Sequence, residues 1–254
     1  MRKQSKSETV IYWAPAYSAR DAYDTNHLYT EPKSLYEEMV AKKAPLKDNA
    51  LDFLRCPATS DLMKHTFVVR APVDTHVALN FDSRRTKDLN TNSAYENTHK
   101  VKLEFVHQPT LLNHNLVNYS HPIVFFSEEE TMIATLTAPY FEKVSSYESG
   151  VIVPGRFDIA KWFRPMNMEF QLWTGVDTLK ISAGEALCYL HFDTDKKIVL
   201  KRFVTNNEIE KLIASFIKVS PFKKFARLSE RYKMFKESNS KQRVLKLIQK
   251  QLIE

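Results

Sequence analysis

The sequence predicts an α+β protein, in which an antiparallel β-sandwich or jelly-roll-like body is followed by a C-terminal helical segment. Short segments rich in β-branched and aromatic residues recur through the body, with turn residues between them. No regular alternation of strands and helices occurs there, which disfavours a parallel doubly wound sheet. From residue 205 onward the apolar residues recur with helical spacing instead. We therefore place a β-rich body at 1–204 and a basic helical segment at 205–254.

The first part of the body contains several segments with the composition of strands. In chain order they lie at 9–13, 66–70, 75–81, 101–106, 122–126 and 131–137. The turn residues 71–74 predict a hairpin between the strands that flank them, and the turn 127–130 predicts a second strand pair. A short helix is predicted over 32–43, because Pro32 supplies the fixed φ that a first helical turn favours.

The segment 150–204 has the clearest strand pattern. Strands are predicted at 150–153, 167–173, 178–182, 186–193 and 197–204. Gly175, Gly184 and the polar run 193–196 mark turns between them. Short strands joined by short turns predict an antiparallel meander, in which each strand pairs with the next one.

The C-terminal segment is predicted to form three helices. Thr205 and Glu208 have the spacing of a capping box, with Thr at the N-cap and Glu three residues later. One face of the first helix would carry Ile209, Leu212, Ile213, Phe216 and Ile217. Ser220 and Pro221 predict the start of a second helix, and the third is predicted over 240–252.

Composition argues against several classes of function. All four glycines lie between Gly150 and Gly184, and no GxGxxG, GxxxxGK(S/T) or GxSxG motif is present. The two cysteines, Cys56 and Cys188, are too few for a disulfide framework and lack zinc-ligand spacing, so reduced thiols in a cytosol are expected. No apolar run reaches the length of a signal peptide or membrane span. The sequence predicts no membrane contact and no cofactor.

Positive charge is concentrated near the C-terminus. The chain has a net charge of +7, whereas residues 201–254 alone carry 14 Lys and Arg against 5 Glu. A basic helical face neutralises phosphates without regard to base sequence, and it also suits an acidic protein partner. The candidate residues for either role are Lys218, Lys223, Lys224, Arg227 and Arg231. The alternative is an amphipathic helix whose lysines and arginines are simply solvated.

A second candidate site is a cluster of charged and aromatic residues in the middle of the chain. Its members are Arg156, Asp158, Trp162, Arg164 and Glu169. Loops between rigid strands concentrate binding residues, and a pair of arginines binds a carboxylate or phosphate in a bidentate manner. The alternative is a turn whose Trp packs into the core while the charges pair locally. No small molecule is singled out by these residue types.

His191 and Asp193 form an HxD pair, which is a weak candidate for two ligands of a metal site. A third ligand would have to come from a histidine upstream, for example His99, His107, His114 or His121. Their spacing matches no known ligand pattern, so a histidine at the end of a strand beside a turn Asp is the competing interpretation. The carboxylates of 128–130 are expected to be a solvated turn rather than an acid–base pair.

Several motifs carry a resemblance to other proteins. They are YWAP at 12–15, CPA at 56–58 with HTFVVRAPVD at 65–74, PGRFDIAKWFRP at 154–165 with EFQLW at 169–173, and GEALCYLHF at 184–192 with VLKRF at 199–203. Through these motifs the chain resembles a family of unknown function from marine tailed bacteriophages and some bacteria. The resemblance implies a phage-encoded protein in the cytoplasm of an infected bacterium or in the virion. It transfers neither an activity nor a catalytic residue.

Three classes of function therefore stay open. The leading one is a non-enzymatic interaction or structural protein that binds itself, a virion component or a host protein. The second is a nucleic-acid-binding protein that uses the basic helical segment. The third is a small-molecule or metal-dependent enzyme with its site in the β body.

Overall fold

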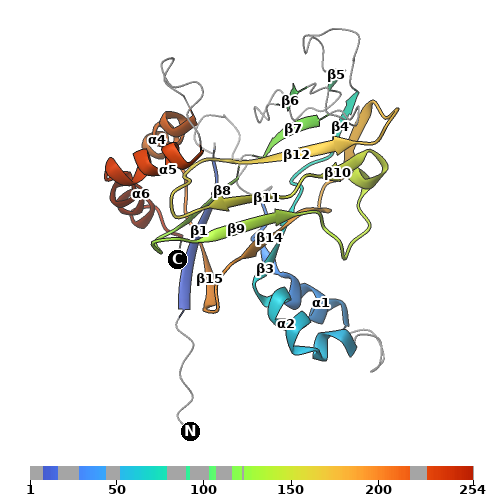
Figure 1. The fold of residues 1–254 in the computed structure, drawn as a ribbon, viewed down its shortest axis with the longest axis horizontal. Coiled ribbons are helices and arrows are strands. Elements are labelled where there is room, and N and C mark those ends of the chain that lie inside the picture. The colour runs from blue at the N-terminus through green and yellow to red at the C-terminus, as the bar shows by residue number, and fades with distance from the viewer. Residues whose placement is uncertain are drawn as a thin grey trace.

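The computed structural model describes residues 8–16, 29–43, 52–78, 90–91, 103–106, 116–121, 123–217 and 228–253. They form an α+β fold with a body of mostly antiparallel sheets and helices at the C-terminal end (Figure 1). The predicted fold class is confirmed. No helix in the described part of the chain is long and apolar enough to cross a membrane.

The elements have the following bounds. The strands are β1 (Glu8–Pro15), β2 (Lys33–Ser34), β3 (Thr66–Arg70), β4 (Thr75–Ala78), β5 (Asn90–Thr91), β6 (Leu103–Val106), β7 (Leu116–His121), β8 (Ile123–Ser127), β9 (Ile133–Thr137), β10 (Gly150–Ile152), β11 (Gly155–Asp158), β12 (Met166–Leu172), β13 (Thr178–Ile181), β14 (Ala186–Phe192) and β15 (Lys197–Arg202). The helices are α1 (Leu35–Lys43), α2 (Pro57–Lys64), α4 (Asn207–Ile217), α5 (Leu228–Glu237) and α6 (Ser240–Gln249), with 3-10 turns η2 (Asp52–Arg55) and η3 (Ser145–Glu148).

The strands form sheets of different sizes. Sheet A has the order β15-β1-β8, sheet B has the order β11-β9-β14-β3-β2, sheet C has the order β13-β4-β5, and sheet D has the order β10-β12-β7-β6. The pairs are antiparallel with the exception of β1 and β15, which run parallel. Because β1 lies between β15 and β8, the two ends of the β body meet in one sheet.

The predicted strands are present, but their predicted partners are wrong. β3 and β4 form no hairpin, because β3 pairs with β2 and β14 while β4 pairs with β5 and β13. β8 and β9 do not pair with each other either. β8 pairs with β1, whereas β9 pairs with β11 and β14. The predicted meander is absent, since β13, β14 and β15 belong to three different sheets. Each of these turns connects strands of two different sheets. The residues of such a turn resemble those of a hairpin turn, so the local sequence does not tell the two kinds of connection apart.

All four sheets contribute to one hydrophobic core in the interior of the body. Phe125 of sheet A lies 6.1 Å from Phe192 of sheet B, measured between ring centroids, and Phe67 lies 5.6 Å from Phe192. Phe170 of sheet D and Leu179 of sheet C are fully buried in the same cluster. Aromatic rings at these separations contribute to stability beyond the area they bury.

The C-terminal helices pack on the outer face of sheet A (Figure 1). Alternation along β1 directs Trp13 into the body core and Tyr12 towards the helices, where Tyr12 joins a second core cluster. Ile213 of α4 and Val244 and Ile248 of α6 are fully buried in that second cluster. Most of β1 and all of β8 are therefore buried on both faces, and the helices share sheet A with the body.

The start of α4 differs in detail from its prediction. Asn206, rather than Thr205, is the N-cap, because its Oδ1 accepts hydrogen bonds from the backbone N–H of Glu208 (3.1 Å) and of Ile209 (2.9 Å). The Thr205 hydroxyl instead donates to the carbonyl oxygen of Pro15 at 3.0 Å and joins the helix to the end of β1. The predicted start of the second helix lies outside the described residues.

Helices α1 and α2 pack on the outer face of sheet B, at the other end of the body (Figure 1). Leu35 and Met63, one from each helix, are fully buried there against Val68 and Tyr189. Ser34 Oγ accepts from the backbone N–H of Glu37, and Glu37 Oε2 accepts from that of Ser34, both at 3.2 Å. This reciprocal capping box fixes the start of α1 directly after β2.

Candidate functional site

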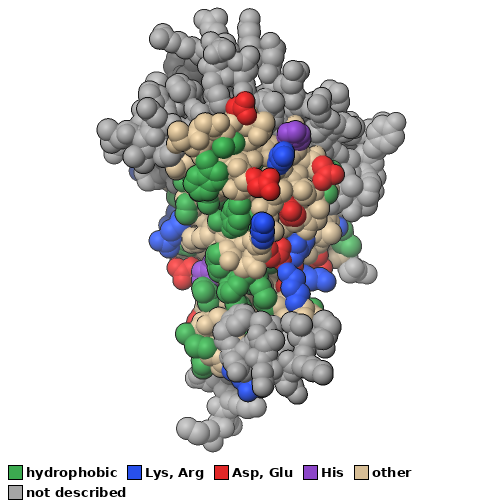
Figure 2. Space-filling view, turned by 90° about the vertical axis from the view of Figure 1, so that its right-hand side faces the viewer, with side chains coloured by type: hydrophobic (Ala, Val, Ile, Leu, Met, Phe, Trp, Pro, Cys, Tyr) green, Lys and Arg blue, Asp and Glu red, His purple; other side chains and the backbone are tan. Residues whose placement is uncertain are grey.

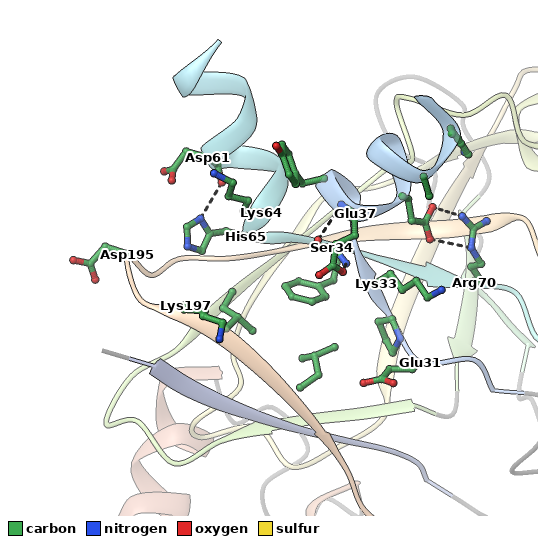
Figure 3. A pocket seen from close by; sticks show the side chains of 18 residues that line it. Glu31, Lys33, Ser34, Glu37, Asp61, Lys64, His65, Arg70, Asp195 and Lys197 are labelled. Carbon is green, nitrogen blue, oxygen red and sulfur yellow. Dashed lines mark hydrogen bonds and ion pairs between the residues drawn. The ribbon is translucent and has the colours of Figure 1, made fainter. Parts of the chain in front are cut away.

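A large groove runs between helices α1 and α2 on one side and strand β15 on the other (Figure 3). Its volume is about 1240 Å³. Phe67 of β3 and Ile198 and Leu200 of β15 supply an apolar lining. Strand β2 borders the groove as well, with Lys33 and Ser34. The groove thus lies between β15, an edge strand of sheet A, and β2, an edge strand of sheet B.

The helical wall of the groove is held by an ion-pair network. Arg70 of β3 contacts Glu38 of α1 through Nη2 and lies 3.3 Å from Glu142, and it donates from Nη1 to the carbonyl oxygen of Gly184 at 2.8 Å. Lys42 Nζ lies 2.6 Å from Glu142. Burial opposes ionisation of Glu142, but the hydrogen bonds from Lys42 and Arg70 outweigh it and lower the pKa of that carboxyl group. Helix α1 is therefore locked onto sheet B.

His65 closes one end of the groove. Its Nδ1 lies 2.9 Å from the carbonyl oxygen of Asp61, and its Nε2 lies 3.1 Å from that of Lys196. Both neighbours are acceptors, so a neutral ring donates to one of them, whereas a ring with a proton on each nitrogen donates to both. The contact ties the end of α2 to the turn between β14 and β15.

Charges of both signs line the groove. Figure 3 shows Asp61 and Lys64 on the side of the helices and Asp195 and Lys197 on the side of β15. Lys64 lies over the ring of Tyr36, with its Nζ 5.1 Å from the centroid. Outside the groove, on the side of the molecule that is on the right in Figure 1, basic and acidic side chains are likewise interspersed (Figure 2). The mixture of charges that lines the groove suits a polypeptide better than a polyphosphate, which would favour a single sign of charge.

The predicted ligand cluster is divided by the fold. Arg156 is exposed on β11, and its Nη2 lies 3.6 Å from Oδ2 of Asp193. Asp158 is buried, and its Oδ1 accepts from the backbone N–H groups of Met132 and Ala160, each at 3.2 Å. Glu169 belongs to sheet D, where alternation places it on the face opposite the core. These three residues do not converge on one site.

Trp162 and Arg164, the other two members of that cluster, stack on each other beside the C-terminal helices. The Arg164 guanidinium carbon lies 4.6 Å from the centroid of the Trp162 ring. Trp162 also contacts Phe157 and Tyr232 of α5, at centroid separations of 5.9 Å and 6.2 Å. The Trp packs between the body and a helix.

Asp193 pairs with Arg156, whereas His191 lies between threonines of the neighbouring strands. In the registers of sheet B, His191 is opposite Thr66 and Thr135, and Thr135 is opposite Arg156. The hydroxyl group of Thr66 donates its only hydrogen to the carbonyl oxygen of Leu62. In the contact of 3.2 Å between Thr66 Oγ1 and His191 Nδ1, the histidine nitrogen is therefore the donor. Burial, and then the proximity of His65, lower the pKa of His191 and favour its neutral form.

Within the described residues, no group of three or more His, Cys, Asp and Glu side chains is placed to hold a metal ion. His99, His107 and His114 lie outside these residues, and the side chain of His121 does too. The same holds for the basic candidates Lys218, Lys223, Lys224 and Arg227 and for the side chain of Arg231. A role for them in binding nucleic acid or an acidic partner stays a prediction.

Sequence reasoning missed the groove because its residues come from distant parts of the chain. Lys33 and Leu200 line the same space although most of the sequence separates them. One local signal was available in the segment 196–202, KKIVLKR. Lysines that flank a short apolar strand are typical of a sheet edge, where they oppose uncontrolled pairing.

Comparisons of the chain with protein-family models, with curated proteins and with solved structures find no match. The function is therefore inferred from the residues and geometry of this chain. Two features carry most of that inference: the dimensions of the groove and the edge strand that borders it.

Proposed function

We propose that the chain is a non-enzymatic binding protein whose groove holds an extended segment of a protein partner. The observation that carries this proposal is the groove of about 1240 Å³ between α1, α2 and β15. Pockets for small molecules usually have volumes of about 300–1000 Å³ and enclose their ligand. A larger groove bordered by two sheet edges fits a length of polypeptide better.

The fixed walls of the groove support the same proposal. Arg70, Glu38 and Glu142 hold α1 in place, and His65 holds the turn before β15. A site that is rigid before binding loses less conformational entropy when a ligand enters. The resemblance to phage proteins supports a virion component or a host protein as the partner.

The experiment is a selection of binders from a displayed library of random peptides, followed by affinity measurements on groove variants. Ala41 is exposed on α1 and lines the groove, whereas its neighbour Val40 is exposed but does not line it. We expect Ala41→Trp to fill the groove and weaken the selected peptides at least about tenfold. Val40→Trp is the matched control and should leave affinity unchanged. Equal binding by both variants would place the peptides elsewhere and overturn the proposal.

A further inference from the structure

Among the described strands, β15 is at the edge of sheet A, and its outer edge faces the groove. In a parallel ladder, successive residues direct their N–H and C=O groups alternately towards and away from the neighbouring strand. Phe203 N–H donates to the Trp13 carbonyl oxygen at 3.1 Å, so the odd-numbered residues face β1. Ile198 and Leu200 therefore direct their backbone groups away from β1, and both residues line the groove.

Both ends of this edge are closed by the protein itself. At one end the Lys196 carbonyl oxygen lies 3.1 Å from His65 Nε2. At the other end the Arg202 carbonyl oxygen accepts from Ile253 N–H at 3.0 Å. Between these contacts, no described residue pairs with the backbone groups of Ile198 and Leu200. The described part of the chain thus leaves a short strand edge open in the middle of the groove.

We propose that the partner segment binds by adding a strand to β15, and that this segment has an aliphatic centre flanked by acidic residues. The inference rests on the proposed function of the groove and specifies the binding mode and the partner's chemistry. Unpaired N–H and C=O groups at a sheet edge are a template for an added strand. At about 3.3 Å per residue, a segment of five residues spans about 17 Å and covers this edge.

The side chains of β15 determine the chemistry of the added strand. Ile198 and Leu200 pack towards the body core, so partner residues beside them would cover apolar surface. Lys197 and Lys201 lie on the other face and are exposed. Lys197 pairs with Glu8 of β1 at 2.7 Å, whereas no described side chain forms an ion pair with Lys201. Acidic residues opposite these lysines would form favourable cross-strand pairs.

A second copy of this chain is a poorer occupant of the same edge. If β15 paired with β15 of another copy in antiparallel fashion, Lys197 of one copy would face Lys201 of the other. Like charges directly opposite each other destabilise a strand pair. An acidic segment of another protein meets no such repulsion at these two lysines.

The test uses a labelled peptide, acetyl-Glu-Val-Thr-Val-Glu-amide, and fluorescence anisotropy at low salt. A peptide with Lys in place of both Glu should bind at least about tenfold more weakly. The added strand is taken to run antiparallel to β15, so that each Val exchanges backbone hydrogen bonds with the residue opposite it, Ile198 or Leu200. N-methylation of both Val residues removes the N–H groups of these pairs and should abolish binding. N-methylation of the Thr, whose N–H would point away from β15, is the matched control. Hydrogen exchange at the Ile198 and Leu200 amides should slow in the complex.

A charge reversal in the protein tests the acidic chemistry of the partner segment separately from strand addition. Lys201→Glu should abolish the preference, because Lys197 still attracts an acidic residue at one end of the peptide while the new carboxylate repels one at the other. Lys236→Glu makes the same change of net charge at an exposed position on α5 and should leave the preference unaltered. Equal affinities of the Glu and Lys peptides for the unaltered protein would overturn the acidic chemistry.

The remaining outcomes distinguish this inference from the proposed function. If peptides bind, are blocked by Ala41→Trp and leave exchange at Ile198 and Leu200 unchanged, strand addition is wrong while the groove keeps its function. If Ala41→Trp blocks no peptide, both proposals fail. A concentration-dependent dimer in sedimentation that protects the same two amides would show that a second copy is the occupant and would overturn the proposal.

Discussion

Asp158 lies where β11 ends, and its environment shows a structural role. Oδ1 accepts from the backbone N–H groups of Met132 and Ala160, while Oδ2 lies 2.6 Å from Lys161 Nζ. Its own N–H donates to the hydroxyl oxygen of Tyr232 on α5 at 3.0 Å. The carboxylate therefore orders a tight turn that joins the body to a C-terminal helix.

We predict that Asp158→Ala destabilises the protein by about 2–4 kcal/mol, because it leaves buried N–H donors and a lysine without their acceptor. Urea denaturation measures this loss. Asp193→Ala is the control, since Asp193 is exposed and its pair with Arg156 is solvated. That variant should change stability by less than about 0.5 kcal/mol. Similar losses in the two variants would contradict the structural role of Asp158.

At the scale of the element, helix α1 depends on charges that titrate in acid. The pKa of Glu142 is lowered in the folded protein relative to its ordinary value of 4.5. A lowered pKa contributes stability above the unfolded value, and this stability is lost as the pH falls through the folded value. Protonation would weaken the contacts of Glu142 with Arg70 and Lys42, and Arg70 in turn holds Glu38 of α1.

We therefore predict that stability falls as the pH drops below about 4.5, and that Glu142→Gln makes this dependence shallower. Urea midpoints for both proteins between about pH 3 and pH 7 provide the measurement. The variant should be less stable than the native protein at neutral pH and should approach it in acid. Parallel pH profiles would show that Glu142 does not supply the effect.

The strands also show what sequence can and cannot predict. The segment 186–193 was predicted as a strand from its composition, and β14 occupies Ala186–Phe192. Its partners β3 and β9 are distant in sequence, and no local signal identifies them. Partner choice follows from which apolar faces meet in the core, which is a property of the assembled sheets. The groove depends on that assembly, so local sequence patterns do not predict it either.

At the scale of the whole molecule, sheet A couples the β body to the C-terminal helices. Trp13 and Phe125 on one face belong to the body core, while Tyr12 and Phe126 on the other face pack with the helices. An electrostatic contact reinforces this junction, because Lys241 of α6 donates to the carbonyl oxygen of Glu129. The Glu129 side chain in turn pairs with Lys196 at 2.7 Å, next to the groove. Loss of the helices would expose one face of the strands that carry the binding edge.

This coupling predicts that the body and helices unfold in one transition. Ile248→Ala removes a fully buried side chain from α6 and should destabilise the whole protein by about 2–5 kcal/mol. Tryptophan fluorescence reports on the body when it is measured in a Trp162→Phe background, because Trp162 contacts Tyr232 of α5. In that background, the fluorescence and far-ultraviolet circular dichroism transitions should both shift to lower urea by the same amount. Ile253→Ala, at a side chain that is 50% exposed, is the control and should shift neither signal appreciably. A circular dichroism transition that precedes the fluorescence transition would instead show that the helices unfold independently, leaving sheet A and its groove edge intact.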